Sequence, residues 1–313
     1  MSLREAAETA ITQCLAVGPD ESCTVVTDDE RRPIGEALYE AARAVGADAV
    51  LVQYPPGEQH GEEPPRPVAA AMRETDVYVA PTTKSLSHTD ARRAATAAGV
   101  RGATMPEITE SVMVEGLAAD YDAIARHCRA VLDQVADAET YRVTTPAGTD
   151  LTLERGDRAW LDDTGIVHDP GDFSNLPAGE VFVSPTSGDG RVVVDGTMSG
   201  QGRVDEPVVF TVEAGQVVDI EDDQLRGEVE TAAAEVGDAA YNLAELGIGA
   251  NVGVAGLVGS VLLDEKAAGT VHVAIGDDAG FGGDVEAPLH LDGVITEPTV
   301  YADGERIDLP APA

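Results

Sequence analysis

Over the first 140 residues, short apolar runs alternate with stretches in which apolar positions recur every three or four residues. The apolar runs predict buried strands at residues 22–28, 48–55, 76–82 and 101–108. The periodic stretches predict helices at residues 3–16, 31–47, 67–74, 89–100 and 120–138. Strands separated by helices are typical of a mainly parallel sheet covered on both faces. The sequence therefore predicts an α/β domain over residues 1–140.

From Tyr141 the pattern changes to alternation of apolar and polar residues, which is typical of half-buried antiparallel strands. A hairpin is predicted over residues 141–155. Further strands are predicted at residues 179–185, 190–196, 206–220, 269–276, 289–295 and 298–307. One clear helix is expected, over residues 223–237. This half is predicted to be a strand-rich α+β domain over residues 141–313, with the domain boundary near residue 140.

The charge balance is strongly acidic. The chain has 57 acidic and 20 basic residues, a net charge of −37, and only two lysines, Lys84 and Lys266. Such a charge argues against nucleic acid as a partner. The acidic residues are dispersed along the chain, and dispersed acid with little lysine resembles the proteins of extreme halophiles, in which concentrated salt screens the repulsion. We therefore expect a halophilic host.

Several features indicate a soluble protein without a membrane partner. No run of 18 or more apolar residues is present, and the first residues form a charged, amphipathic start rather than a signal peptide. The cysteines Cys14, Cys23 and Cys128 are scattered, which predicts free thiols in a reducing compartment. We expect a cytoplasmic location.

The second half places ligand-type side chains next to glycines and in strands. Glu180 lies at the mouth of a predicted strand, Glu245 before a glycine-rich turn, and His272 within a strand. His290 and Asp292 are two residues apart in another strand and so point to the same face. Imidazole and carboxylate together suit zinc, cobalt, manganese or iron(II), and this set is large enough for two ions. From the residues alone, structural hydrogen bonds remain an alternative for each of them.

His88 lies in a loop that leaves the carboxyl end of a predicted parallel strand, where ligands often approach such sheets. Its side chain is a candidate for contact with substrate. The alternative is a loop histidine that caps the helix starting at Thr89.

Five successive motifs resemble the thermophilic metallo-aminopeptidase family, also called the aminopeptidase T family: NLPAGEVF, AELGIGAN, LDEKAAGTVHVAIGDD, HLDGVI and PTVYADGERI. A weaker similarity covers SLSHTDARRAATAAGVRGATMP. The resemblance implies a homodimeric hydrolase that removes N-terminal residues from small peptides by means of a metal-activated water. It implies two divalent ions, such as zinc, cobalt or manganese, held by Glu180, Glu245, His272, His290 and Asp292. Glu180 would be a ligand or the catalytic base.

One departure introduces a second interpretation. Family aminopeptidases have a tyrosine seven residues after the first ligand histidine, and this chain has Ala279 there. Ring-cleaving dioxygenases that act on dihydroxypyridine resemble the same family and hold a single iron(II) at the positions of His272, His290 and Asp292. In those enzymes a histidine similar to His88 approaches the small-molecule substrate, and Glu180 and Glu245 would only orient the ligands. The sequence favours the hydrolase, with the dioxygenase and a catalytically silent metal-binding relative as alternatives.

Overall fold

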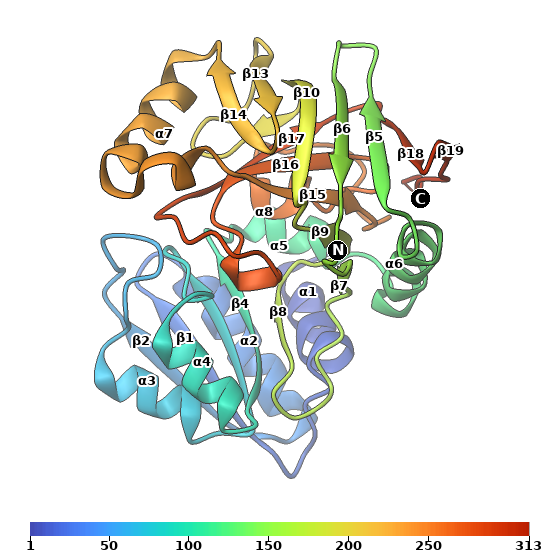
Figure 1. Cartoon of the computed structure of the whole chain (residues 1–313). Coiled ribbons are helices and arrows are strands. Elements are labelled where there is room, and N and C mark those ends of the chain that lie inside the picture. Colours follow the sequence, from blue (N-terminus) through green and yellow to red (C-terminus); the bar gives the residue numbers. More distant parts are fainter. Residues whose placement is uncertain (313) are drawn as a thin grey trace. The chain divides into compact units, whose positions relative to one another are not determined.

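The computed structural model describes residues 1–312, and the chain divides into two compact units (Figure 1). Unit 1 contains Met1–Ala125 and Asp163–Ala178, and unit 2 contains Arg126–Asp162 and the chain from Gly179 onward. Unit 1 is an α/β unit with a parallel sheet and unit 2 is rich in antiparallel strands, which confirms the predicted fold class. The chain passes between the units after Ala125, Asp162 and Ala178, so this division has more crossings than the single boundary predicted near residue 140.

Unit 1 contains a five-stranded parallel sheet in the order β2-β1-β3-β4-β8. Its strands are β1 (Ser22–Asp28), β2 (Asp48–Tyr54), β3 (Val77–Thr82), β4 (Arg101–Pro106) and β8 (Phe173–Asn175). The first four match the predicted apolar runs. The fifth comes from the segment that returns to unit 1 after residue 162, which local periodicity did not predict. The helical elements are α1 (Leu3–Thr9), the π-helix η1 (Ala10–Cys14), α2 (Arg32–Val45), α3 (Arg66–Arg73), α4 (Asp90–Ala97) and α5 (Glu110–Gly116).

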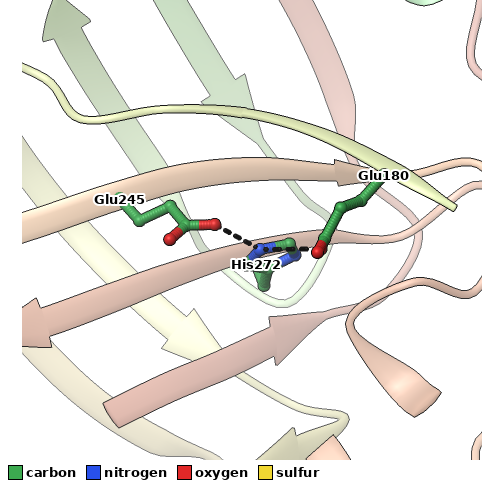
Figure 2. A group of neighbouring side chains, drawn as sticks. All are labelled: Glu180, Glu245 and His272. Atoms are coloured by element: carbon green, nitrogen blue, oxygen red, sulfur yellow. Dashed lines mark hydrogen bonds and ion pairs between the residues drawn. The ribbon is translucent and has the colours of Figure 1, made fainter. Parts of the chain in front are cut away.

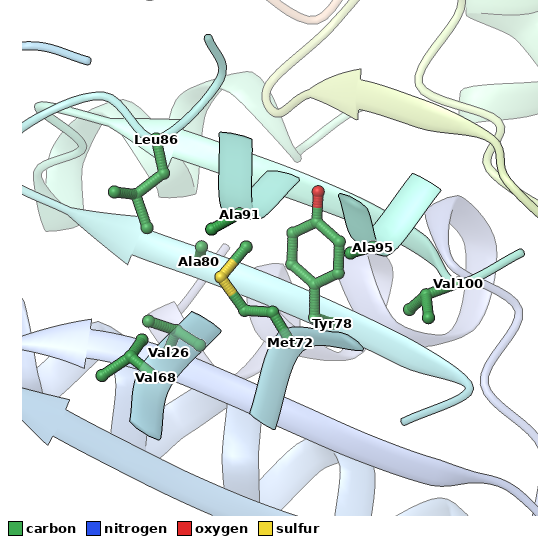
Figure 3. Packing of buried hydrophobic residues seen from close by; sticks show 9 residues of the cluster. All are labelled: Val26, Val68, Met72, Tyr78, Ala80, Leu86, Ala91, Ala95 and Val100. Carbon is green, nitrogen blue, oxygen red and sulfur yellow. The ribbon is translucent and has the colours of Figure 1, made fainter. Parts of the chain in front are cut away.

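A hydrophobic cluster lies between the sheet of unit 1 and the helices α3 and α4 (Figure 3). Val68 and Met72 are four residues apart on α3 and therefore lie on the same side of that helix, facing the cluster. Tyr78 of β3 is fully buried among these side chains. A Cβ at Gly102, its neighbour on β4, would lie 2.2 Å from the tyrosine ring, so the glycine makes room for the ring.

Arg101, at the start of β4, connects the sheet by hydrogen bonds to the segment that follows the N-terminal helices. Its guanidinium donates two hydrogen bonds of 2.7 Å to the carboxylate of Glu21. The same side chain donates to the carbonyl oxygens of Leu15 and Ala16, at 3.0 and 3.2 Å. Arg101 is only 8 % exposed, so its charge depends on these partners.

Unit 2 contains two seven-stranded sheets, with the orders β14-β13-β10-β6-β5-β18-β19 and β12-β11-β17-β16-β15-β9-β7. The first consists of β5 (Thr140–Thr144), β6 (Asp150–Glu154), β10 (Ser187–Val194), β13 (Val208–Glu213), β14 (Gln216–Ile220), β18 (Thr299–Ala302) and β19 (Glu305–Arg306). The second consists of β7 (Leu161–Asp163), β9 (Glu180–Val183), β11 (Thr197–Met198), β12 (Gly202–Arg203), β15 (Leu243–Gly249), β16 (Val271–Gly276) and β17 (His290–Ile295). The helical elements are α7 (Asp223–Val236), η2 (Gly237–Tyr241), α8 (Val261–Asp264) and η3 (Ala279–Phe281), and α6 (Tyr121–Val135) enters the unit from unit 1.

The stretch after residue 242 differs from the sequence prediction. Residues expected to form a glycine-rich turn instead form β15, a strand that is buried along its whole length between β9 and β16. Within residues 1–312, no helix is both long and apolar enough to cross a lipid bilayer.

Replacing Glu21 by Gln should lower the free energy of unfolding by about 1.5–3 kcal/mol, the usual contribution of hydrogen bonds to charged groups. The hydrogen bond from Arg101 lowers the pKa of Glu21, so the pair contributes stability at neutral pH. That stability is lost as the pH falls through the lowered pKa, so the difference between variant and wild type should shrink in acid. Urea unfolding at about pH 7 and about pH 3 measures both effects.

Glu8→Gln is the matched control, because it breaks an exposed ion pair with Arg4. The side chains of Glu8 and Arg4 are 45 % and 83 % exposed, respectively. Exposed pairs contribute about 0–1 kcal/mol. Equal losses in the two variants would contradict a structural role for the Arg101 pair.

Candidate metal centre

The candidate ligands lie on one face of one sheet in unit 2. In the register of this sheet, Asp292 lies opposite Ala274, and Ala274 opposite Glu245. Gly247 pairs with His272 on one side and with Phe182 on the other. Because residues two apart on a strand share a face, the four strands β17, β16, β15 and β9 direct the predicted set to the same side. That set is Glu180, Glu245, His272, His290 and Asp292.

The carboxylate of Glu245 lies between the two imidazoles. Its Oε1 is 2.9 Å from His272 Nε2 and its Oε2 is 3.4 Å from His290 Nε2. Asp292 Oδ1 lies 3.2 Å from the same nitrogen of His290. Glu180 approaches His272 from the side opposite Glu245, with Oε2 at 3.5 Å from Nε2 (Figure 2). The structure thus brings all five predicted residues together.

Backbone carbonyls orient both imidazoles. His272 Nδ1 lies 3.2 Å from the carbonyl oxygen of Glu265, and His290 Nδ1 lies 2.7 Å from that of Asp277. A proton on each Nδ1 would be donated to these carbonyls, which leaves Nε2 directed at the carboxylates. Histidines that bind metals have this arrangement, with the second ring nitrogen fixed by a hydrogen bond.

Burial and mutual contact shift the pKa values of the cluster in both directions. Burial raises the pKa of Glu180 to about 7, although Lys266 acts against the shift. For Glu245, the hydrogen bonds with His272 and His290 outweigh burial and lower the pKa to about 2. Burial disfavours charge on His272, but the bond with Glu245 raises its pKa to about 9. The imidazoles and carboxylates are therefore one another's counter-charges, and a metal ion would have to displace protons to bind here.

The donor set fits a divalent cation. Three overlapping groups have ligand atoms within 4.8 Å of one another: Glu180 with Glu245 and His272, Glu245 with His290 and Asp292, and Glu265 with His272 and Asp292. Glu180 Oε2 is buried and has no hydrogen-bond partner among the described residues. A buried carboxylate oxygen in this position can be satisfied by a cation. Oxygen and imidazole nitrogen donors suit zinc, cobalt, manganese or iron(II).

Two residues of the cluster were missed by sequence reasoning. Lys266 is 1 % exposed, and its Nζ lies 3.1 Å from Glu180 Oε1 and also contacts the carboxylate of Glu265. The scarcity of lysine in the chain was a signal that could have identified Lys266. Glu265 is one of 57 acidic residues and had no distinguishing signal.

Gly247 makes room for His272 on the neighbouring strand. A Cβ at this position would lie 2.0 Å from the Nε2 and Cε1 atoms of the imidazole, closer than any side chain can approach. The ring therefore lies across the backbone of β15, and only glycine permits this. The sequence pattern marked this glycine as part of a turn, whereas its role is close approach within a strand.

Ala279 begins the short helix η3, and an aromatic residue follows two positions later. Phe281 packs edge-on against His290, with ring centroids 5.4 Å apart, and against Phe182, at 5.6 Å. The buried carboxylate of Asp278 anchors this segment by accepting a 2.8 Å hydrogen bond from Ser184 Oγ. Phe281 thus packs on His290 and Phe182 packs on Phe281, whereas the tyrosine expected from the aminopeptidase resemblance is absent.

His88 lies in unit 1, in the loop between β3 and α4. The N-cap of α4 is Thr89, whose hydroxyl accepts a hydrogen bond from the backbone N–H of Arg92. The carbonyl oxygen of His88 accepts a 2.8 Å hydrogen bond from Arg93. The N-cap position of α4 thus belongs to Thr89, and the contact of His88 with substrate stays a prediction.

Comparison with known proteins identifies one family, and solved structures with a similar fold include the following two. The 2,5-dihydroxypyridine 5,6-dioxygenase (NicX) family matches residues 2–308. The 2,5-dihydroxypyridine dioxygenase of Pseudomonas putida KT2440 superimposes with a TM-score of 0.80 at 18% identity, over 99% of this chain and 96% of that one. AmpT of Thermus thermophilus superimposes with a TM-score of 0.70 at 20% identity, over 97% and 96%. No curated protein matches the sequence. At these identities the two structures show a shared fold.

Replacing Gly247 by Ala should displace the His272 imidazole, because the new Cβ would occupy the position of the ring. We expect the affinity for Mn²⁺ to fall at least about tenfold, as when a residue that orients a metal ligand is lost. Isothermal titration calorimetry measures the change.

Gly227→Ala on α7 is the control, since no atom lies within 4 Å of a Cβ there. The control should bind Mn²⁺ like the wild type. Unchanged binding by Gly247→Ala would contradict a role for His272 in holding the ion.

Proposed function

The chain belongs to the 2,5-dihydroxypyridine 5,6-dioxygenase family, and from this premise we propose that it is an iron(II)-dependent dioxygenase that opens a dihydroxylated pyridine ring. The family match over residues 2–308 is the observation that carries this proposal. It favours the ring-cleaving alternative over the peptide hydrolase that the sequence motifs first indicated. The overall reaction breaks one ring carbon–carbon bond and incorporates both atoms of dioxygen into the product.

His272, His290 and Asp292 are the proposed ligands of the iron. Two imidazoles and one carboxylate are the donor set of many non-haem iron oxygenases, and this set leaves coordination positions open for other ligands. When bound, the ferrous ion would supply the redox chemistry that lets dioxygen react with an aromatic ring. Asp292 is held in place through its backbone N–H, which donates a 3.0 Å hydrogen bond to Ser199 Oγ.

Glu180 is the proposed acceptor of a substrate proton, whereas Glu245, whose pKa its two imidazole partners lower, stays ionised and orients His272 and His290. A divalent ion held here would make a ring hydroxyl more acidic, and a carboxylate within the cluster would be placed to take its proton. Glu180 Oε2 is buried without a hydrogen-bond partner among the described residues, and burial raises the pKa of this carboxyl group, so it is placed to hold a proton. We propose that His88 contacts the substrate, as the resemblance implies.

The aromatic side chain of Phe281, which packs on His290 and on Phe182, supports a flat, aromatic substrate. Phe182 and Phe281 meet edge to face at an interplanar angle of 80°, and Phe281 meets His290 at 89°. Edge-to-face and offset contacts between aromatic rings are favourable. Every dihydroxypyridine has a ring that can make such contacts. A peptide can make them only when its N-terminal side chain is aromatic.

An aminopeptidase is the second candidate, favoured by the position of Glu245. This residue belongs to two of the ligand groups, as a carboxylate bridging two ions would. AmpT, whose fold is shared, fits the same interpretation. In that case two zinc, cobalt or manganese ions would activate a water molecule for attack on a peptide carbonyl. Ala279, in place of the expected tyrosine, weighs against this candidate.

With iron(II) and 2,5-dihydroxypyridine, the protein should consume one dioxygen per substrate molecule, as an oxygen electrode can measure. Asp292→Ala should lower kcat more than about 100-fold, because loss of a ligand exceeds the 10–100-fold effect of losing a residue that only orients one. Asp219→Ala, on the exposed part of β14, is the control and should keep full activity. Release of N-terminal amino acids from peptides, with two ions bound and no oxygen uptake, would instead establish the aminopeptidase.

Phe281→Leu should raise the KM for the dihydroxypyridine roughly 2- to 10-fold with a smaller change in kcat, since an aromatic pair contributes about 0.5–1.5 kcal/mol. Phe281→Tyr retains the ring and should remain close to the wild type. Steady-state kinetics with both variants measures the difference. A KM that does not change with Leu would contradict contact between this ring and the substrate.

A further inference from the structure

We propose that Lys266 is a positioning residue that holds the Glu180 carboxylate with one oxygen directed at the metal-binding cluster. The inference rests on the divalent-metal site of the proposed function, where Glu180 lies beside the ligand His272, and it also applies to the two-ion alternative, where Glu180 is itself a ligand. Its basis is the contacts of Lys266, its burial and its rarity in this chain.

Lysine is almost absent from this protein, so its presence at position 266 is informative. Only two of the 20 basic residues are lysines, and the others are arginines. Lys266 is among the largest fully buried side chains. An ammonium group is compact and donates in three directions, whereas a guanidinium is a wide, planar fork. A site that must fit between two carboxylates next to a metal cluster suits the ammonium.

The burial of Lys266 requires its negatively charged partners. Moving a charged group from water into the protein interior costs on the order of several kcal/mol, unless an opposite charge compensates it. Lys266 Nζ lies 3.1 Å from Glu180 Oε1, and it also contacts the carboxylate of Glu265. Glu180 is itself buried and needs the ammonium in return. The pair is therefore coupled: without Lys266 both carboxylates lose this counter-charge, whereas without Glu180 the ammonium keeps Glu265 as its partner.

The two oxygens of Glu180 have different surroundings. Oε1 faces the ammonium of Lys266, whereas Oε2 is buried, has no hydrogen-bond partner among residues 1–312, and lies 3.5 Å from His272 Nε2. A carboxylate fixed through one oxygen cannot rotate freely about its last bond. Lys266 thereby directs the second oxygen to the place where His272 and Glu245 also converge.

Hydrogen bonds on both sides fix the backbone of Lys266 and so fix the origin of its side chain. Its carbonyl oxygen accepts a 2.8 Å hydrogen bond from the backbone N–H of Asn251, and its own N–H donates to the carbonyl oxygen of Leu263 at 3.1 Å. The segment lies between α8 and β16, and β16 carries His272. Lys266 and the imidazole are thus anchored to the same short stretch of chain.

A double-mutant cycle on metal affinity tests the proposal. Mn²⁺ is titrated calorimetrically into the wild type, Lys266→Met, Glu180→Gln and the double variant, with Lys84→Met as the control at the other lysine. We expect Lys266→Met to weaken Mn²⁺ binding about 10- to 100-fold, the usual effect of losing a residue that supports the surroundings of the metal ligands. If Lys266 acts through Glu180, the double variant should bind Mn²⁺ like Glu180→Gln alone. The control should match the wild type.

Two results would overturn the proposal: unchanged Mn²⁺ affinity in Lys266→Met, or independent effects that multiply in the double variant. If Lys266→Met does not fold, the comparison of the double variant with Glu180→Gln still decides, because the double variant removes both charges of the pair. A further loss of affinity in the double variant then counts against the proposal. Oxygen uptake by the wild type is scored separately, so failure of the dioxygenase assignment leaves this test intact.

Discussion

The contact of one carboxylate with two imidazoles is the interaction on which the site depends. Glu245 reaches both His272 and His290 from the middle of a buried strand. Burial of any one of these groups without a partner would destabilise the fold, and their hydrogen bonds and opposite charges offset that cost. The rest of the local structure follows from keeping these side chains in contact. Backbone carbonyls fix the far side of both imidazoles, and Lys266 and Ser199 hold the flanking acidic residues.

The sheet makes such a cluster possible because its register leaves space beside the long side chains. Small residues occupy positions between the ligands on the same face: Gly247 next to His272, and Ala274 between Glu245 and Asp292. A larger side chain at either position would separate the donors. Strand pairing therefore determines which groups meet, and residue size determines how closely they approach.

Much of the fold and the predicted ligand set followed from the sequence because both depend on local pattern. Apolar runs marked β1 to β4, and a spacing of two residues placed His290 and Asp292 on one face. What was missed depends on distant contacts. β8 joins the first sheet only after the chain has left unit 1 and returned, and the glycines of β15 suggest a turn until the His272 ring beside them is known. The homodimer, the cytoplasmic location, the halophilic host and the substrate contact of His88 stay predictions.

The ligands by themselves do not select the reaction, since the same imidazoles and carboxylates serve either one ion or two. Selection must come from what surrounds them. Four carboxylates, those of Glu180, Glu245, Glu265 and Asp292, converge on the cluster, and Lys266 compensates one of their charges. Once the imidazoles lose their protons, these carboxylates favour divalent cations of any kind. The ring of Phe281, which packs on His290 and on Phe182, is more selective, because it places an apolar, aromatic surface beside this imidazole. The charged N-terminus of a peptide gains little from this aromatic surface. A flat hydroxylated ring can interact with the metal site through its hydroxyl groups and with the aromatic surface through its ring.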